Sequence, residues 1–248
     1  MLNFDKSIKD VIIEYPIIGD FLLANDIDCA NCSLGSCLLK DVLEIHNYDE
    51  KMQQEMNEYM AQLVNGEVEE LKIFAPQETK QEYSRIIKRL MDEHQKILEM
   101  VYIAEYITRQ EDYYSKYREE IDEMIVFFKE YADEFHHGKE EDVLFKYFEK
   151  IEILEVMYQE HELSRSMRTQ LIEATGNDLK IKALLAEYGT MLKDHINKED
   201  TILFPYLDRK LTSEQLEAID KELDKVDYTI ESDLERFVRE FNKKEFNM

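Results

Sequence analysis

The chain of 248 residues is long enough for one large domain or for a helical bundle joined to a smaller unit, and its 44% hydrophobic content is sufficient for a core. Six glycines and three prolines are few for this length, which predicts an all-α fold with long helices and almost no sheet. The formal net charge of -25 argues against nucleic acid and membrane surfaces as partners, because binding to phosphate groups depends on Lys and Arg.

Residues 1–65 are predicted to form a small helical domain. Its apolar periodicity predicts short helices over 7–15, 16–23, 38–45 and 49–64. A turn-rich loop between the second and third of these helices holds all three cysteines, Cys29, Cys32 and Cys37. The periodicity lapses after this domain, so we expect a linker over residues 66–78.

From residue 79 onward the helical pattern is almost continuous. It predicts four long helices over 79–109, 112–149, 151–175 and 178–207. Short connections make successive helices antiparallel, so residues 79–207 are expected to form an up-down-up-down four-helix bundle. The run from Thr212 to Gln215 matches a capping box and predicts a fifth helix, packed on the bundle within residues 208–248.

Histidine and glutamate recur at helical spacing in this segment. His137 precedes Glu141 by four residues, and His195 precedes Glu199 by four, which places each pair on one face of a helix. Solitary histidines lie on the apolar stripes of the other two long helices. Together they predict a dinuclear metal site that faces the bundle interior, with the ligands His94, His137, Glu141, His161, His195 and Glu199.

The second long helix offers a competing pair of ligands. His136 competes with His137, because Glu140 follows His136 by four residues. We predict His137 and Glu141 because they continue the apolar stripe through Leu144, whereas His136 would point aside.

Four imidazoles and two carboxylates suit iron or manganese, with zinc as an alternative, whereas calcium or magnesium would take oxygen ligands. Two bridging carboxylates and one oxo or hydroxo bridge give roughly five ligands per ion, which leaves open positions for oxygen, peroxide or nitric oxide. A lone histidine on an apolar face is more often a packed residue than a ligand. The combined pattern favours a metal, because so many buried polar groups would be costly without a cation.

Two further carboxylates lie next to the predicted ligands. Asp133 lies one turn before His137, and Glu160 adjoins His161. Either could orient a ligand or relay protons in catalysis, and a solvated acidic surface is the alternative for both.

At these residues the chain resembles the hemerythrin-like cation-binding (HHE) domain. The resemblance rests on His94, on FHHGKEEDVLF at 135–145, on EH at 160–161 and on HINKEDTILFP at 195–205. Within that superfamily the chain most resembles the di-iron proteins for repair of iron centres, which act on iron–sulfur clusters after nitrosative or oxidative stress. The resemblance covers 79–207, and 1–65 more weakly, and implies two bridged iron ions at the predicted ligands.

One position departs from the oxygen-carrying hemerythrins. Those proteins have a second histidine one turn after the ligand of the third helix, and this chain has Arg165 there. The resemblance therefore implies an open coordination site, which favours reactivity over reversible oxygen carriage.

The cysteines also depart from the repair family, whose usual signature is an adjacent cysteine pair. Here Cys29 and Cys32 form a CxxC motif, followed by Cys37. The three thiolates, with His46 as a fourth ligand, could hold zinc or an iron–sulfur cluster. Alternatively Cys29 and Cys32 cycle as a dithiol, or the cysteines are structural.

The expected function is a cytoplasmic non-heme di-iron protein that protects or repairs iron–sulfur clusters. It would donate iron, or react with nitric oxide or peroxide as an oxidoreductase, with damaged iron–sulfur proteins as partners. The first ten residues carry no basic-then-apolar signal pattern, and no apolar run approaches the roughly 18 residues of a membrane span. The alternative is a hemerythrin-like oxygen-binding protein or redox sensor, and a homodimer is also open.

Overall fold

The computed structural model describes residues 2–27, 37–74, 82–148, 151–174, 176–225 and 231–246. These residues form helices and no β-strand, apart from one isolated bridge between Ser7 and Leu38, which confirms the predicted all-α class. Within the same residues no helix combines the length and the apolar composition needed to cross a membrane. The chain divides into two compact units, Met1–Glu82 with Lys150–Val156 and Ile202–Arg209, and Tyr83–Glu149 with Met157–Thr201 and Lys210–Met248.

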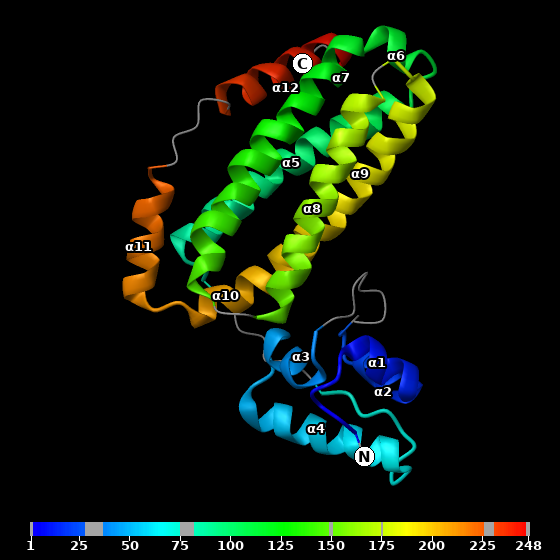
Figure 1. Cartoon of the computed structure of the whole chain (residues 1–248), viewed down its shortest axis with the longest axis vertical. Helices are drawn as coiled ribbons and strands as arrows, with labels where there is room; N and C mark the ends of the chain where they lie inside the picture. Colours follow the sequence, from blue (N-terminus) through cyan, green and yellow to red (C-terminus); the bar gives the residue numbers. More distant parts are fainter. Residues whose placement is uncertain are drawn as a thin grey trace. The chain divides into compact units, whose positions relative to one another are not determined.

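The first unit contains four helices of the N-terminal segment (Figure 1, blue to cyan). They are α1 (Ile8–Glu14), α2 (Pro16–Ala24), α3 (Leu39–Ile45) and α4 (Glu50–Asn65). The side chains of Ser7 and Asp49 cap α1 and α4 by accepting backbone N–H bonds. Phe21 of α2 shares an apolar core with Met56 and Met60 of α4, and its ring contacts Tyr59 of α4 with centroids 5.7 Å apart.

Part of the predicted linker belongs to this unit. Phe74 is buried in its core, and its N–H donates to Asn25 Oδ1 at 2.6 Å. Asn25 Nδ2 donates in turn to the carbonyl of Lys72 at 3.1 Å. Residues 72–74 are therefore packed on the first unit and do not act as the predicted linker of residues 66–78, because the buried amide of Asn25 binds their backbone. Residues 75–81 lie outside the described part of the chain.

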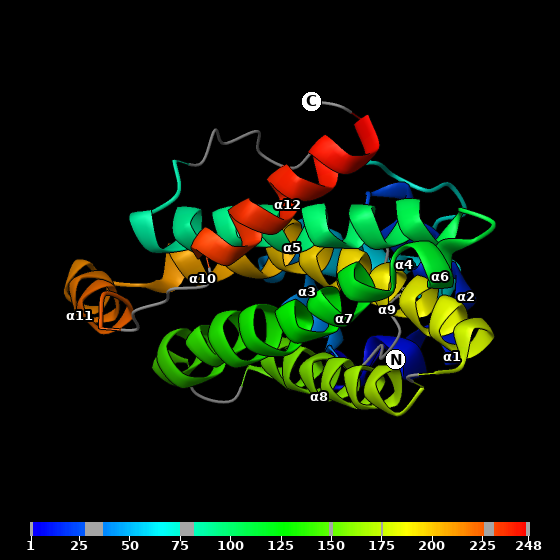
Figure 2. The ribbon, with the colours of Figure 1, turned by 90° about the horizontal axis from the view of Figure 1, so that it is seen from above.

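The second unit is built on long helical segments that run side by side (Figures 1 and 2). They are α5 (Arg85–Thr108), α7 (Arg118–Phe127) with the helical turns that follow it, α8 (Glu152–Glu173) from residue 157 onward, and α9 (Asp178–Lys198). α5 and α9 make the most extensive contact of any pair. A Cβ on Gly189 of α9 would lie 3.0 Å from Val101 Cγ1, so this glycine permits the close approach of α9 to α5.

The second and fourth predicted helices are not continuous α-helices. The second begins as the short α6 (Tyr113–Lys116) and breaks at Tyr117 before α7. It then continues as the π-helices η1 (Phe128–His137) and η2 (Glu140–Leu144) and the 3₁₀-helix η3 (Phe145–Tyr147). The fourth passes from α9 into the π-helix η4 (Glu199–Leu203) and then α10 (Phe204–Lys210). The π-helical turns carry several of the histidines and glutamates considered above.

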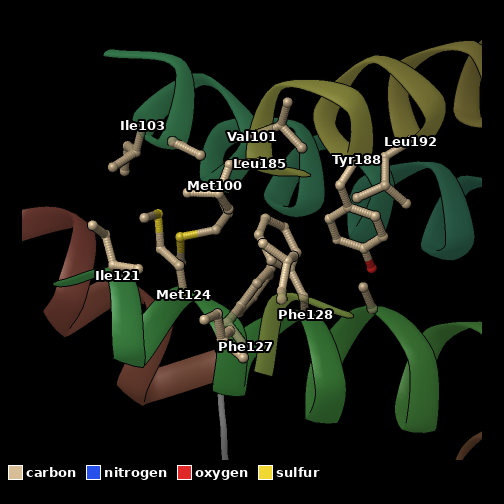
Figure 3. Close-up of a cluster of buried hydrophobic side chains, with 14 of the residues drawn as sticks. Met100, Val101, Ile103, Ile121, Met124, Phe127, Phe128, Leu185, Tyr188 and Leu192 are labelled. Atoms are coloured by element: carbon tan, nitrogen blue, oxygen red, sulfur yellow. The ribbon is translucent and has the colours of Figure 1, made fainter. Parts of the chain in front are cut away.

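The main core fills the second unit between α5, α7 and α9. Figure 3 shows Met100 of α5, Met124 of α7 and Phe128 of η1 directed toward one another. Tyr188 of α9 is fully buried beside them, and its hydroxyl shares a hydrogen bond of 3.0 Å with Ser164. These contacts fix the helices that carry the polar residues of the interior.

The predicted fifth helix is two helices, α11 (Ser213–Leu223) and α12 (Glu231–Phe246), and residues 226–230 between them lie outside the described residues. The capping box of Thr212 and Gln215 is confirmed at the start of α11. α12 crosses α5 obliquely (Figure 2), with Phe237 and Phe241 buried in the main core. Its Glu245 accepts hydrogen bonds from Tyr117 and Tyr106, so polar contacts also hold α12 in place.

Candidate metal centre

Two groups of buried imidazoles and carboxylates lie in the interior of the second unit. The three-imidazole group consists of His137, Glu140, His161 and His195. The two-imidazole group consists of His94, His136, Glu140 and Glu199. In each group one donor atom per residue lies within 4.8 Å of every other, and Glu140 belongs to both groups.

Each long helical segment supplies part of this arrangement. α5 provides His94, η1 and η2 provide His136, His137 and Glu140, α8 provides His161, and α9 with η4 provides His195 and Glu199. All seven side chains are at most 1% exposed as residues. The groups are therefore held by rigid helices and shielded from water.

Five of the six predicted ligands lie together in these groups, namely His94, His137, His161, His195 and Glu199. The structure corrects the sixth: Glu141 lies outside both groups, and Glu140 takes its place. The side chain of Glu141 is 23% exposed, and it accepts a hydrogen bond from His161 Nδ1 at 2.6 Å. His136, which was expected to point aside, belongs to the two-imidazole group.

The π-helical turns explain this correction. A π-helix closes i→i+5 hydrogen bonds, so each turn holds about one more residue than an α-helical turn. The apolar stripe of α7, extended at the α-helical period, therefore loses its phase across η1. Consequently both His136 and His137 face the interior, and Glu140 does so in place of Glu141. The HxxxE spacing of His136 and Glu140 was the available sequence signal for them.

The Nδ1 atom of each imidazole faces a carboxylate. Four of the pairs are at hydrogen-bond distance: His94 with Asp200 at 2.7 Å, His136 with Glu93 at 3.0 Å, His161 with Glu141 at 2.6 Å, and His195 with Glu160 at 2.9 Å. Asp133 Oδ1 lies farther from His137 Nδ1, at 3.8 Å. Because an ionised carboxylate can only accept, Nδ1 carries a proton in these four pairs, which leaves Nε2 as the atom that would bind a cation.

Cationic side chains hold several of these carboxylates. Lys139 is 1% exposed and donates to Glu93, while Lys198 donates to Glu160. Asp133 and Glu160 were predicted from the sequence to orient a ligand or relay protons. In the structure they lie beside His137 and His195 respectively. Glu93, Asp200 and the lysines were not predicted, since their role depends on contacts between helices.

The atoms that face the centre of the site lie close to one another: Glu199 Oε2 is 3.1 Å from His94 Nε2 and 3.2 Å from His195 Nε2. Within the described residues, Nε2 of His136, His161 and His195 makes no hydrogen bond. The same holds for both carboxylate oxygens of Glu140 and of Glu199. Leaving such buried polar atoms unsatisfied is costly, at about 1–3 kcal/mol for each neutral group and more for a charged one. Their convergence therefore fits a cation that would bind them.

The pKa values of the interior groups diverge. Burial opposes a charge on His94, but the hydrogen bond to Asp200 and the nearby carboxylate of Glu199, 3.1 Å from Nε2, outweigh it and raise the pKa of His94 to about 9. Burial lowers the pKa of His137 to about 3. Burial and then the charge of Glu199 raise the pKa of Glu140 well above its usual range. Surrounding imidazoles outweigh burial at Glu199 and hold its pKa well below the usual range. A bound cation would favour the deprotonated form of every one of these ligands.

The donor set narrows the choice of metal. Five imidazole nitrogens and two carboxylates suit a transition metal, whereas calcium and magnesium prefer oxygen ligands almost alone. Two overlapping groups that share Glu140 are suited to a pair of ions with a bridging carboxylate. The residues present therefore fit the expected dinuclear site, with iron, manganese or zinc as the compatible ions.

The structure describes only part of the predicted cysteine site. Cys29 and Cys32 lie in residues 28–36, outside the described part of the chain. Cys37 is half-buried, and its carbonyl accepts the N–H of Ile8 at 2.8 Å. Neither Cys37 nor His46 belongs to a potential metal-binding group of the described residues.

Comparison with known proteins identifies one family. The family model described as the hemerythrin HHE cation binding domain matches residues 85–207 and also residues 152–245. No curated protein and no solved structure matches the chain. The first match spans every residue of the two donor groups.

Proposed function

Because the chain belongs to the hemerythrin HHE cation-binding domain family, we propose that it is a di-iron protein whose second unit holds both ions. The proposed ligands are His94, His136, His137, Glu140, His161, His195 and Glu199. The observation that supports this proposal is the pair of buried donor groups that share the carboxylate of Glu140. In this proposal the four helical segments follow the up-down-up-down order of a four-helix bundle.

The count of ligands also bears on reactivity. Iron takes about six donor atoms, and a bridging oxo or hydroxo group would add one to each ion. If Glu140 and Glu199 both bridge, the three-imidazole ion has its full complement, and the ion beside His94 and His136 keeps one position. Arg165 would therefore not leave an open coordination position on the three-imidazole ion, because His137 supplies the third imidazole of that group.

The surrounding residues would determine what binds at the open coordination position of the ion beside His94 and His136. Bound iron would supply a redox-active Lewis acid for a small ligand such as oxygen, nitric oxide or peroxide. Glu140 and Glu199 would offset the charges of the two ions, and the carboxylates behind Nδ1 would keep each imidazole in its binding tautomer. Burial of all seven ligands would exclude bulk water from the site.

Anaerobic iron titration tests the dinuclear site. We expect two iron ions per chain and two Mössbauer quadrupole doublets, because the donor groups differ in their number of imidazoles. The His195→Ala variant is expected to bind the ion of the three-imidazole group at least ~10-fold more weakly, since it removes a direct ligand. Uptake of fewer than two ions by the wild-type chain would contradict the proposal.

We propose further that the protein protects or repairs iron–sulfur clusters in a reducing compartment such as the cytoplasm. The resemblance to proteins for repair of iron centres and the three cysteines of the N-terminal segment support this finer assignment. The test is to add the iron-loaded chain to a nitrosylated iron–sulfur protein and to measure the recovery of cluster absorbance. Recovery should fall in His195→Ala and in Cys29→Ser. No recovery with the wild-type chain would count against repair.

Oxygen binding or redox sensing is the second candidate. It is favoured by the five imidazoles, because they leave a single position for an external ligand at the proposed centre. Stopped-flow spectra of the reduced, iron-loaded chain distinguish the candidates. Reversible uptake of oxygen favours binding or sensing, whereas rapid oxidation or consumption of nitric oxide favours the reactive function.

A further inference from the structure

Arg165 of α8 connects two of the carboxylates that lie behind the imidazoles. Its Nη1 donates to Asp133 Oδ1 at 2.9 Å, and its Nη2 donates to Glu141 Oε1 at 2.7 Å. Its Nε donates to Glu162 at 2.9 Å, so three donors of one planar group are engaged. The side chain is 27% exposed, which places the guanidinium between the interior and the solvent.

The two carboxylates serve the same donor group. Glu141 accepts from His161 Nδ1 at 2.6 Å, and Asp133 lies 3.8 Å from His137 Nδ1. The rings of His137 and His161 stack in parallel, with centroids 4.0 Å apart and planes inclined by 10°. The guanidinium of Arg165 thus contacts the groups behind two neighbouring imidazoles of the three-imidazole group, and Arg168 makes a second contact with Asp133, its Nη2 lying 3.2 Å from Oδ2.

The two-imidazole group has a different support. Glu93 faces His136 Nδ1 and accepts a hydrogen bond from Lys139, which lies over the Phe135 ring at 3.4 Å from its centroid. Asp200 faces His94 Nδ1. The cations that hold the carboxylates therefore differ between the two groups, with Arg165, Arg168 and Lys198 on one side and Lys139 on the other.

We propose that Arg165 is a positioning residue for one ion of the pair, the ion of the three-imidazole group. The proposal rests on the proposed two-ion site and adds that different cationic side chains support the two donor groups. Arg165 holds Asp133 and Glu141 in place, and these carboxylates keep His137 and His161 with Nε2 directed inward. Its planar fork presents separate Nη donors to the two carboxylates in a fixed geometry, which the compact ammonium of a lysine does not reproduce.

The expected consequence is selective. Loss of the partner behind a metal-binding imidazole typically weakens metal affinity about 10- to 100-fold. Arg165→Met should therefore weaken the binding of the ion at the three-imidazole group by about this factor, and the other ion should bind with near wild-type affinity. Arg165→Lys should give an intermediate effect. Lys139→Met should produce the opposite pattern, because Lys139 holds the carboxylate behind His136.

The experiment is a zinc titration followed by the ring nitrogen signals of the histidines in NMR spectra. In Arg165→Met, the signals of His94 and His136 should shift with the first equivalent, and those of His137 and His161 only at ~10- to 100-fold higher free zinc. Without zinc, the fraction of His161 in the Nδ1–H tautomer should also fall. Arg118→Met is the matched control, because Arg118 makes a surface pair with Asp122 at 3.1 Å.

Two results would overturn the role of Arg165. One is that Arg165→Met takes up both ions as the wild type does and keeps the His161 tautomer. The other is that it loses both ions equally while circular dichroism shows an unchanged helical content. If the wild-type chain itself binds fewer than two zinc ions, the two-ion proposal fails, and the zinc-free tautomer of His161 still decides whether Arg165 positions that ring.

Discussion

Two adjacent glutamates show how side-chain position decides chemistry in this chain. Glu140 is fully buried, and neither of its carboxylate oxygens makes a hydrogen bond within the described residues. Glu141 is partly exposed and binds both His161 and Arg165. The first carboxylate is therefore placed to bind cations, and the second is placed to orient an imidazole.

Substitution of these two residues should separate the roles. Glu140→Gln is expected to abolish tight binding of both ions, because Glu140 belongs to both donor groups. Glu141→Gln should keep two ions and weaken one of them about 10-fold, since it acts through His161. Metal content after dialysis against a weak chelator measures both effects. Equal losses in the two variants would contradict the assignment of Glu140 as the shared ligand.

At the level of elements, the π-helices set the register of the site. η1 carries His136 and His137, η2 carries Glu140, and η4 begins at Glu199. A π-helix is rare and is less favourable than an α-helix, and it occurs frequently at functional sites. Here it brings adjacent histidines into one interior, which an α-helix with about 100° between residues would not readily allow.

Deletion of one residue from η1 tests this register. Removal of Lys129, whose side chain is 43% exposed, should let the segment regain α-helical bonding. His136, His137 and Glu140 would then rotate by about 100° relative to α7, and tight binding of both ions should be lost. Circular dichroism should show a retained helical content, and metal analysis measures the loss.

A deletion outside the π-helix serves as the control. Glu111 is exposed in the connection between α5 and α6, so its removal should shorten a surface turn and leave the donor groups intact. If the Lys129 deletion binds two ions as the wild type does, the π-helical register does not determine the site.

At the level of the whole molecule, every proposed ligand lies in one of the two compact units. The unit that spans Tyr83–Glu149 and Met157–Thr201 contains both donor groups, whereas the N-terminal helices have their own apolar core. A ligand that binds only the folded state stabilises the unit that contains its site. Metal binding should therefore act on the stability of one unit.

Removal of metal should lower the unfolding temperature of the second unit alone. At a free metal concentration 100 times Kd, one site contributes about 2.7 kcal/mol, and this contribution disappears with a chelator. Differential scanning calorimetry should show one transition that moves and one, from the N-terminal unit, that does not. In Glu140→Gln the chelator should change the unfolding temperature of the second unit very little. A chelator shift of the same size in that variant would contradict binding at these ligands.

Local patterns in the sequence were sufficient to predict a large part of this protein. The helical period located the long helices and placed His94, His161 and His195 on interior faces, and the capping box marked the start of α11. These features depend on residues within a few turns of one another, so the sequence carries them directly. The family match over 85–207 agrees with this part of the prediction.

The tertiary structure decided the features that depend on distant contacts. The exchange of Glu141 for Glu140 follows from the π-helical register, which the α-helical period does not reveal. Phe74 joins the N-terminal core through Asn25, and Arg165 reaches Asp133 from another helix. Periodicity assigns a residue to a face of its own helix. Which groups meet in the interior depends on the packing of several helices, and that packing determined which carboxylate lies at the centre of the site and which one supports it.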